Sequence, residues 1–283
     1  MASTRLSICA DQVRRQDRDR YLTALFAPAE RREDLFALYA FNLEVAKTAE
    51  VVSEAMVGRI RLQWWREAVE EIYDGRPRAH AVVESLAQTV ERHDLPRALF
   101  DRLIDAREAD LDGEPPADFA ALEAYAEGTA ASLFALALGV LGSPADRGPA
   151  GEAAHHLGIA WALTGLARAV PFHARQKRSY LPSELTREAG LDMVELFELR
   201  SSPALARVIE AIAACANDRV QAARRLRRDV PRPAASLLLF APLAADHLSR
   251  LRRAGFNPFD PLVQAERPGA VWRVAWAAWL RRT

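Results

Sequence analysis

Apolar residues recur at helical spacing along almost the whole chain, and this periodicity constrains the fold more than any other feature. The stretch 35–45 shows it clearly, and so does the stretch 157–166. Residues three or four positions apart share one face of a helix, whereas the residues of a half-buried strand alternate between two faces. We find no convincing strand pattern, so the sequence predicts an all-α protein.

Residues that end helices divide these periodic segments. Proline, glycine and other turn-forming residues cluster at 27–28, 74–77, 94–96, 113–116, 142–144, 202–203, 230–233 and 257–258. These breakers predict about ten helices joined by short connections. Because short connections place consecutive helices side by side, we predict that residues 1–283 form one helical bundle and one domain. Pro242 lies inside an otherwise helical stretch, where its ring should bend or divide the helix.

Two segments, 129–141 and 157–170, consist almost entirely of apolar and small residues. A helix that is apolar on every side is surrounded by other helices, and small residues allow these neighbours to approach closely. Both segments are therefore predicted to be central. They could also line a hydrophobic ligand tunnel, but plain core packing is the commoner use of such residues and is favoured here.

The charge balance argues against nucleic acid as a partner. Lysine plus arginine and aspartate plus glutamate both number 38, so the formal net charge is zero and no global field attracts a polyanion. No apolar run reaches the roughly 18 residues that cross a membrane, and no export signal stands at the start. We therefore expect a soluble or peripheral cytoplasmic protein whose distant cysteines, Cys9 and Cys215, are free thiols. Residues 1 to about 15 are expected to be disordered.

Carboxylates spaced four residues apart on central helices would allow a bundle to chelate Mg²⁺ and bind a diphosphate. In the stretch 40–54 only Glu50 and Glu54 have this spacing, and Lys47 lies on the same side as Glu50. The stretch 164–178 contains no acidic residue. Its ionisable residues are Arg168, His173, Arg175, Lys177 and Arg178. The pattern therefore favours anions over divalent metal ions.

The order and spacing of several segments resemble squalene and phytoene synthases. These segments are 38–41 (Leu-Tyr-Ala-Phe), 61–69, 103–110, 125–129 and 163–182, the last of which ends in Tyr-Leu-Pro. The resemblance extends over residues 21–182 and implies an isoprenoid-synthase-type helical bundle around a central cavity. In active members of the family, an aspartate-rich motif follows the Tyr-Ala-Phe, and an Asp-x-x-x-Asp motif precedes the Tyr-Leu-Pro.

Both aspartate motifs are degenerate in this chain. The first retains only Glu50 as an acid, beside Ala46 and Lys47, and the second reads Ala169 and His173 at its two aspartate positions. Magnesium requires near-octahedral oxygen ligation, and its stabilisation of a diphosphate leaving group is worth several kcal/mol. We therefore expect no bound metal, no other cofactor and no catalytic residue, so that the fold persists without the condensation chemistry.

Further residues resemble one branch of the family, that of mitochondrial complex I assembly factor 6 and its bacterial relatives. The likeness lies in 40–44, 52–54, 61–73, 125–127 and 166–173, and in the tryptophan-containing C-terminal segment. It implies a non-catalytic protein at the cytoplasmic face of the inner membrane, with complex I subunits or assembly intermediates as partners. We expect a basic, tryptophan-rich helix over 268–283, which fits a membrane or partner interface and equally the closing helix of the bundle.

The motif aspartates are replaced, and several lysine and arginine side chains lie near them in the sequence. This combination predicts an anion-binding pocket instead of a metal site. The candidate ligand-binding residues are Tyr39, Phe41, Lys47, Arg61, Arg168, His173, Arg175, Lys177, Arg178 and Tyr180. Two rival functions stay open. One is an Mg²⁺-dependent head-to-head prenyl diphosphate transferase in which Glu44, Glu50, Asp105 and Asp110 replace the lost carboxylates. The other is metal-independent binding of a lipid or a prenyl diphosphate.

Overall fold

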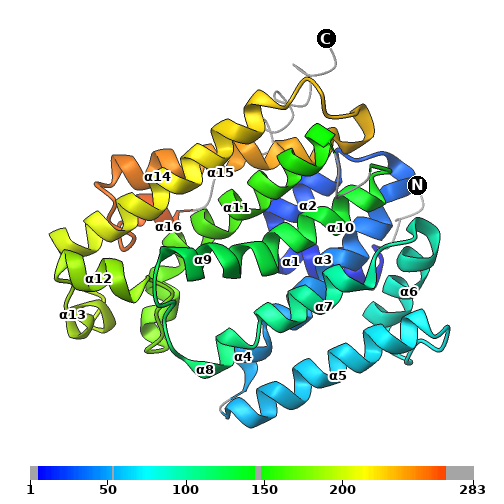
Figure 1. Cartoon of the computed structure of the whole chain (residues 1–283), viewed down its shortest axis with the longest axis horizontal. Coiled ribbons are helices and arrows are strands. Elements are labelled where there is room, and N and C mark those ends of the chain that lie inside the picture. Colours follow the sequence, from blue (N-terminus) through cyan, green and yellow to red (C-terminus); the bar gives the residue numbers. More distant parts are fainter. Residues whose placement is uncertain (1–5, 53, 144–147, 266–283) are drawn as a thin grey trace.

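The computed structural model describes residues 6–52, 54–143 and 148–265, which form a bundle of helices (Figure 1). In chain order these are α1 (Ile8–Gln16), α2 (Arg18–Ala24), η1 (Ala29–Arg31), α3 (Arg32–Ala46), α4 (Thr48–Val51), α5 (Ala55–Tyr73), α6 (Ala81–His93), α7 (Arg97–Ala106), α8 (Ala109–Asp112), α9 (Phe119–Ala126), η2 (Glu127–Ala131), α10 (Ser132–Val140), α11 (Gly148–Arg175), α12 (Ser183–Ala189), α13 (Met193–Phe197), α14 (Pro203–Arg225), η3 (Arg232–Leu239), α15 (Phe240–Arg253) and α16 (Pro261–Gln264). These described residues contain no strand, which confirms the predicted all-α class. The short helices α4, α8, α13 and α16 are additions to the predicted set.

The N-terminal segment is helical where disorder was predicted. The hydroxyl of Ser7 accepts a hydrogen bond from the backbone N–H of Ala10 at 3.0 Å and so caps the first turn of α1. Cys9, Ala10 and Val13 are buried, and α1 packs against α3 and α6. The prediction of disorder over 1–15 is therefore wrong from Ile8 onward, because an apolar stripe on this short helix completes the core. Residues 1–5 lie outside the described part of the chain.

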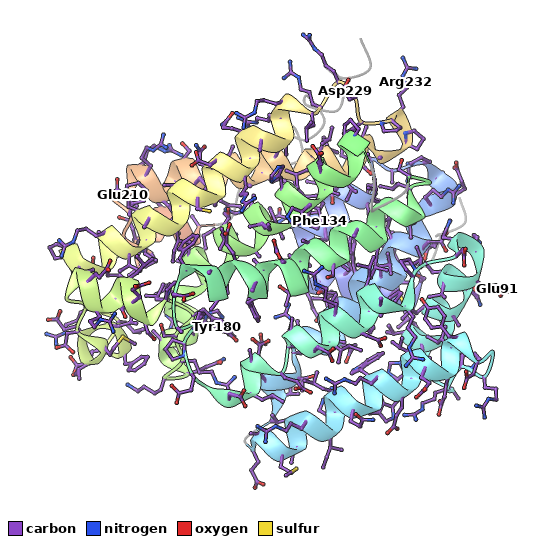
Figure 2. All side chains as sticks on the ribbon, viewed as in Figure 1. Glu91, Phe134, Tyr180, Glu210, Asp229 and Arg232 are labelled. Carbon is purple, nitrogen blue, oxygen red and sulfur yellow. The ribbon has the colours of Figure 1, made fainter. Side chains whose placement is uncertain are left out.

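Helices α10 and α11 form the centre of the bundle, as predicted. Figure 1 shows them in green between α14 and α15 on one side and α3 and α7 on the other, and the packing contacts agree. Phe134 on α10 is 1% exposed and lies in the middle of the molecule in Figure 2. The largest cluster of buried apolar side chains extends from Cys9 on α1 to Val263 on α16, so elements from both ends of the described chain share it.

One close contact between helices is made possible by a glycine on α11. A Cβ atom added to Gly158 would stand 2.5 Å from the Cα and 2.8 Å from the backbone N of Ala131, in the π-helical turn η2. These are backbone atoms, which cannot swing aside as the end of a side chain does. On the same helix, a Cβ added to Gly165 would meet nothing within 4 Å.

Pro242 divides its helical stretch, as predicted. The 3₁₀ segment η3 ends at Leu239 and α15 begins at Phe240, which places Pro242 in the first turn of the new helix. A first turn tolerates proline because its backbone N–H groups have no partner within the helix.

Two expectations about the membrane concern different parts of the chain. Within the described residues, no helix combines the length and the apolar character that crossing a bilayer requires. The tryptophan-rich helix expected over 268–283 lies outside the described residues.

We predict that Gly158→Ala destabilises the protein by about 1–3 kcal/mol, because the new methyl group forces α11 away from η2. The matched control is Gly165→Ala, which adds the same methyl group to the same helix in open space. It should be neutral or stabilising by up to about 1 kcal/mol, because alanine favours the helix. Urea unfolding curves measure both changes, and equal effects of the two variants would contradict the close contact at Gly158.

Candidate functional site

A cavity of about 1140 Å³ lies where the α1–α2 junction, α11, α15 and α16 meet. It is lined by Glu50 from the first degenerate motif and by Ala169 from the second. The structure therefore brings the remnants of both motifs to one cavity, at the position where the resemblance places a ligand site.

One face of α11 forms a wall of this cavity. Trp161, Thr164, Gly165 and Arg168 line it, and their spacing of three and four residues places them on a single side of the helix. The opposite side is core, since Ile159, Leu163 and Ala167 are fully buried. The prediction that 157–170 serves core packing is thus right for one face of the helix and incomplete for the other.

A buried ion pair from the α1–α2 junction forms the facing wall. One carboxylate oxygen of Asp17 accepts a hydrogen bond from the backbone N–H of Arg20 at 3.0 Å and caps α2, and the other accepts from the Arg20 guanidinium. Arg20 is only 9% exposed, and its guanidinium carbon lies 5.8 Å from the centre of the Tyr39 ring. The sequence pattern does not single out Asp17 or Arg20, because they stand within a run of alternating charges typical of a solvated segment.

Arg168 is held by a buried histidine from α15. Its guanidinium lies 3.0 Å from Nε2 of His247, which is 2% exposed, and the Asp19 carboxylate lies 3.5 Å from the same nitrogen. A guanidinium only donates hydrogen bonds, so the His247 nitrogen is the acceptor in its contact with Arg168. Asp19 also lines the cavity and brings a carboxylate to the same histidine. Neither Asp19 nor His247 is a sequence-predicted site residue, because only tertiary contact brings α2 and α15 to Arg168.

The residues present do not fit a magnesium cluster. Ala46 and Ala169 offer no ligand atom, and Glu50 shares the cavity with the guanidinium of Arg168. The other two carboxylates of the lining, Asp17 and Asp19, are engaged by Arg20 and His247. Glu50 beside a fixed cation offers too few oxygens to an ion that needs several in octahedral geometry. Across residues 6–52, 54–143 and 148–265, no three His, Cys, Asp or Glu side chains gather in a way that could hold a metal ion.

A second polar cluster is centred on Asp110, which is 5% exposed. The hydroxyls of Tyr125 and Tyr180 each donate to its Oδ1 at 2.8 Å. Arg107 donates to its Oδ2 at 3.1 Å and to the Tyr125 hydroxyl at 2.7 Å, and Arg178 donates to its backbone carbonyl at 3.1 Å. Burial holds the pKa of Tyr125 well above its usual range, so its hydroxyl keeps its proton and donates.

His173 belongs to this second cluster and not to the cavity. Its ring lies 4.6 Å from that of Tyr180, which Figure 2 shows on the segment that follows α11. Burial lowers the pKa of His173 to about 4, with Asp110 opposing and Arg178 adding to the effect. The imidazole is therefore neutral at pH 7. The structure thus separates Arg168 from His173, Arg178 and Tyr180, which the sequence placed in one anion pocket.

The other candidate ligand-binding residues are dispersed. Phe41 is packed in the core with its ring 5.5 Å from Trp65, and Tyr39 is 1% exposed beside Arg20. Lys47 is half-buried between α3 and α4, and Arg175 is exposed at the end of α11. Arg61 lies 4.0 Å from Glu44, and Lys177 donates to the backbone carbonyl of Phe197 at 3.3 Å. Of these residues, none lines the cavity.

The four carboxylates of the transferase alternative also lie apart. Glu44 accepts from Gln12 at 2.5 Å, Asp105 pairs with Arg66 at 2.7 Å on the surface, and Asp110 is the centre of the second cluster. Only Glu50 lines the cavity among these four. They therefore form no common metal site.

Comparison with known proteins gives a consistent set of likenesses. The sequence profile of the squalene/phytoene synthase family matches residues 13–279. The Homo sapiens protein named NADH dehydrogenase (ubiquinone) complex I, assembly factor 6 is 33% identical over 256 residues, which cover 90% of this chain and 76% of the human one. The presqualene diphosphate synthase of Rhodopseudomonas palustris is 30% identical over 172 residues, or 60% of each chain. The crystal structure of squalene synthase HpnC from Alicyclobacillus acidocaldarius matches with a TM-score of 0.78 at 22% identity, covering 89% of this chain and 94% of that one. This last likeness confirms the fold that the sequence predicted.

We predict that Asp110→Ala destabilises the protein by about 3–5 kcal/mol, because it leaves the largely buried Arg107 without its carboxylate. The control is Asp105→Ala, which removes an acid whose side chain is 63% exposed and whose partner also binds Glu108. Asp105→Ala should lower the free energy of unfolding by less than about 1 kcal/mol. Thermal and urea unfolding of both variants test the contrast, and similar losses would exclude the Asp110 cluster as a structural centre.

The lowered pKa of His173 also predicts a pH dependence of stability. Because the folded value of about 4 lies below the ordinary 6.5, the unfolded chain binds the extra proton first, and stability falls as the pH is lowered from 6.5 towards 4. Between pH 6.5 and 4, the free energy of unfolding of His173→Asn should fall by about 1–2 kcal/mol less than that of the unmodified chain, a figure that allows for the partial exposure of His173. Urea unfolding at a series of pH values gives the comparison. Parallel stability curves for the two proteins would rule out the buried neutral histidine.

Proposed function

The chain belongs to the squalene/phytoene synthase family, and we propose that this member assists the assembly of respiratory complex I without catalysing prenyl transfer. One observation carries the proposal. The cavity that contains the remnants of both aspartate motifs presents Arg168, held by His247, and two of its three carboxylates, Asp17 and Asp19, are engaged by Arg20 and His247. The 33% identity with a human complex I assembly factor over 90% of this chain supports the same conclusion.

Electrostatics explains why such a cavity is poorly suited to condensation. Ionisation of an allylic diphosphate develops negative charge on the leaving group, and metal ions stabilise that charge by several kcal/mol. Arg168 attracts a diphosphate, but its charge is already shared with His247 and Asp19. The second cluster contributes no base or acid to this cavity, because Asp110 and His173 lie outside it and are engaged with Tyr180. We expect no dependence on Mg²⁺ or on another cofactor.

The proposal includes the partners and the place of action. Complex I subunits or assembly intermediates are the expected partners, at the cytoplasmic face of the inner membrane, where the protein acts from the cytoplasm as a peripheral component. Nucleic acid is not an expected partner, because the formal net charge is zero.

A second candidate function is metal-independent binding of a phosphorylated lipid or a prenyl diphosphate. The volume of about 1140 Å³ favours it, together with a lining that joins Arg168 to the apolar side chains of Tyr21, Leu22, Leu25 and Trp161. The transferase alternative has in its favour the 30% identity with a presqualene diphosphate synthase. Against it stands the separation of Glu44, Asp105 and Asp110 from the cavity.

We predict that deleting the gene lowers the amount of assembled complex I severalfold and leaves squalene-type products unchanged. Native gels with an NADH activity stain measure the first outcome, and mass spectrometry of extracted lipids measures the second. Purified protein incubated with farnesyl diphosphate and Mg²⁺ should release no diphosphate, with an active family member as the positive control. Release of diphosphate would establish a transferase. Binding of farnesyl diphosphate in EDTA, with complex I normal in the deletion strain, would establish the ligand-binding function instead.

A further inference from the structure

Four large apolar side chains stand exposed together at one corner of the bundle. Val51 on α4 is 60% exposed, and Met56, Val57 and Ile60 on the first turns of α5 are 62%, 45% and 61% exposed. Met56 and Ile60 lie four residues apart on one side of α5, with Val57 beside them, and α4 packs against α5. We call these four residues the apolar corner. In Figure 1 it lies at the lower edge of the molecule, where α4 meets α5.

The apolar corner differs from ordinary surface apolar residues because Met56, Val57 and Ile60 are neighbours on one face of α5, next to the helix that carries Val51. Single exposed apolar side chains are normal and need no explanation, whereas a contiguous group marks an interaction surface. Val194 on the distant helix α13 illustrates the ordinary case, since it is also 60% exposed but no other large apolar side chain of that helix is comparably exposed.

The surface that continues along α5 from the apolar corner is acidic. Three arginines there are each shared between two carboxylates: Arg66 between Asp105 and Glu108, Arg78 between Glu67 and Glu71, and Arg97 between Glu70 and Asp101. Each of these groups of three therefore carries one uncompensated negative charge. At the corner itself, Arg59 is paired with Asp112 at 2.9 Å and Arg61 lies 4.0 Å from Glu44, so the corner is close to neutral. We call the three carboxylate-rich groups the acidic band.

We propose that the apolar corner and the acidic band together bind a protein segment in which the end of a hydrophobic helix is followed by lysines or arginines. The corner would cover the apolar end of that segment, and the band would pair with its basic continuation. This inference rests on the proposed function and names the chemistry of the partner. Membrane-embedded subunits have this order of residues on the cytoplasmic side, where basic residues flank their apolar helices.

The same charges decide against a lipid surface as the occupant. Anionic lipids on the cytoplasmic leaflet attract basic segments and repel acidic ones. Three of the six carboxylates of the acidic band, Glu67, Glu70 and Glu71, lie on α5, the helix that carries most of the apolar corner. A second copy of this chain fits poorly as well, because a symmetric contact through this face would place one acidic band near another.

The test uses the full chain and two labelled peptides. Both contain the same leucine-rich helical segment, which ends in a run of lysines in one peptide and a run of glutamates in the other. Fluorescence anisotropy should show the lysine peptide binding at least about tenfold more tightly than the glutamate peptide. Met56→Asp and Ile60→Asp should each weaken binding of the lysine peptide by about tenfold or more. Val194→Asp is the matched control, equally exposed and equally apolar, and should leave binding unchanged.

Several results would overturn the inference. In the peptide assay, these are equal affinity for the two peptides, no binding of the lysine peptide, or a Val194→Asp variant that weakens binding as much as Ile60→Asp does. Binding to anionic vesicles that Ile60→Asp abolishes would show a lipid surface as the occupant. A dimer in light scattering that Ile60→Asp dissociates would show a second copy of the chain. Circular dichroism and unfolding curves verify that each variant is folded, which is expected because the substituted side chains are exposed.

A genetic experiment separates this inference from the proposed function. In a strain lacking the gene, the unmodified chain and Val194→Asp should restore complex I, whereas Ile60→Asp should restore it poorly. Full restoration by Ile60→Asp would exclude the apolar corner as the binding surface and leave the assembly function intact. Normal complex I in the deletion strain would instead reject the assembly function itself.

Discussion

The contact between the backbone of η2 and Gly158 of α11 constrains the packing at the centre of the bundle. It brings two central helical segments to a distance that no side chain larger than hydrogen would permit. The face of α11 that carries Trp161, Thr164 and Arg168 is consequently turned towards α2 and α15, where the cavity lies. The end of the same helix places His173 against Tyr180. A packing constraint in the core thus sets the position of both polar clusters.

Much of the fold could be predicted from the sequence because it depends on local patterns. Helical periodicity and breakers are properties of neighbouring residues, so the all-α class, the central segments and the division at Pro242 follow from them. The failure over 1–15 has a tertiary cause. Helix α1 is short and charged on one side, and its order comes from the burial of Cys9 and Val13 against other helices.

The candidate site was less predictable, because its polar partners are distant in sequence. Arg168, one of the predicted ligand-binding residues, lines the cavity, but the contacts that link it to His247 and His247 to Asp19 join three helices and leave no local signature. His173 and Arg178 were grouped with it because they follow it on the same segment. His173 lies on another face of α11, five positions after Arg168, and Arg178 follows the end of the helix, so both meet the Asp110 cluster instead. The motif substitutions alone therefore do not predict which contacts take the place of the aspartates.

The convergence of Tyr125, Tyr180 and Arg107 on one carboxylate has a dynamic consequence. These groups come from α9, from the segment after α11 and from the end of α7, and each hydrogen bond orients the acceptor for the others. If one of these segments opens locally, the buried carboxylate of Asp110 loses a hydrogen-bond partner and the remaining bonds weaken. The three segments should therefore open together. In hydrogen exchange, their amides would behave as a single cooperative unit, although more than 70 residues of chain separate the first from the last.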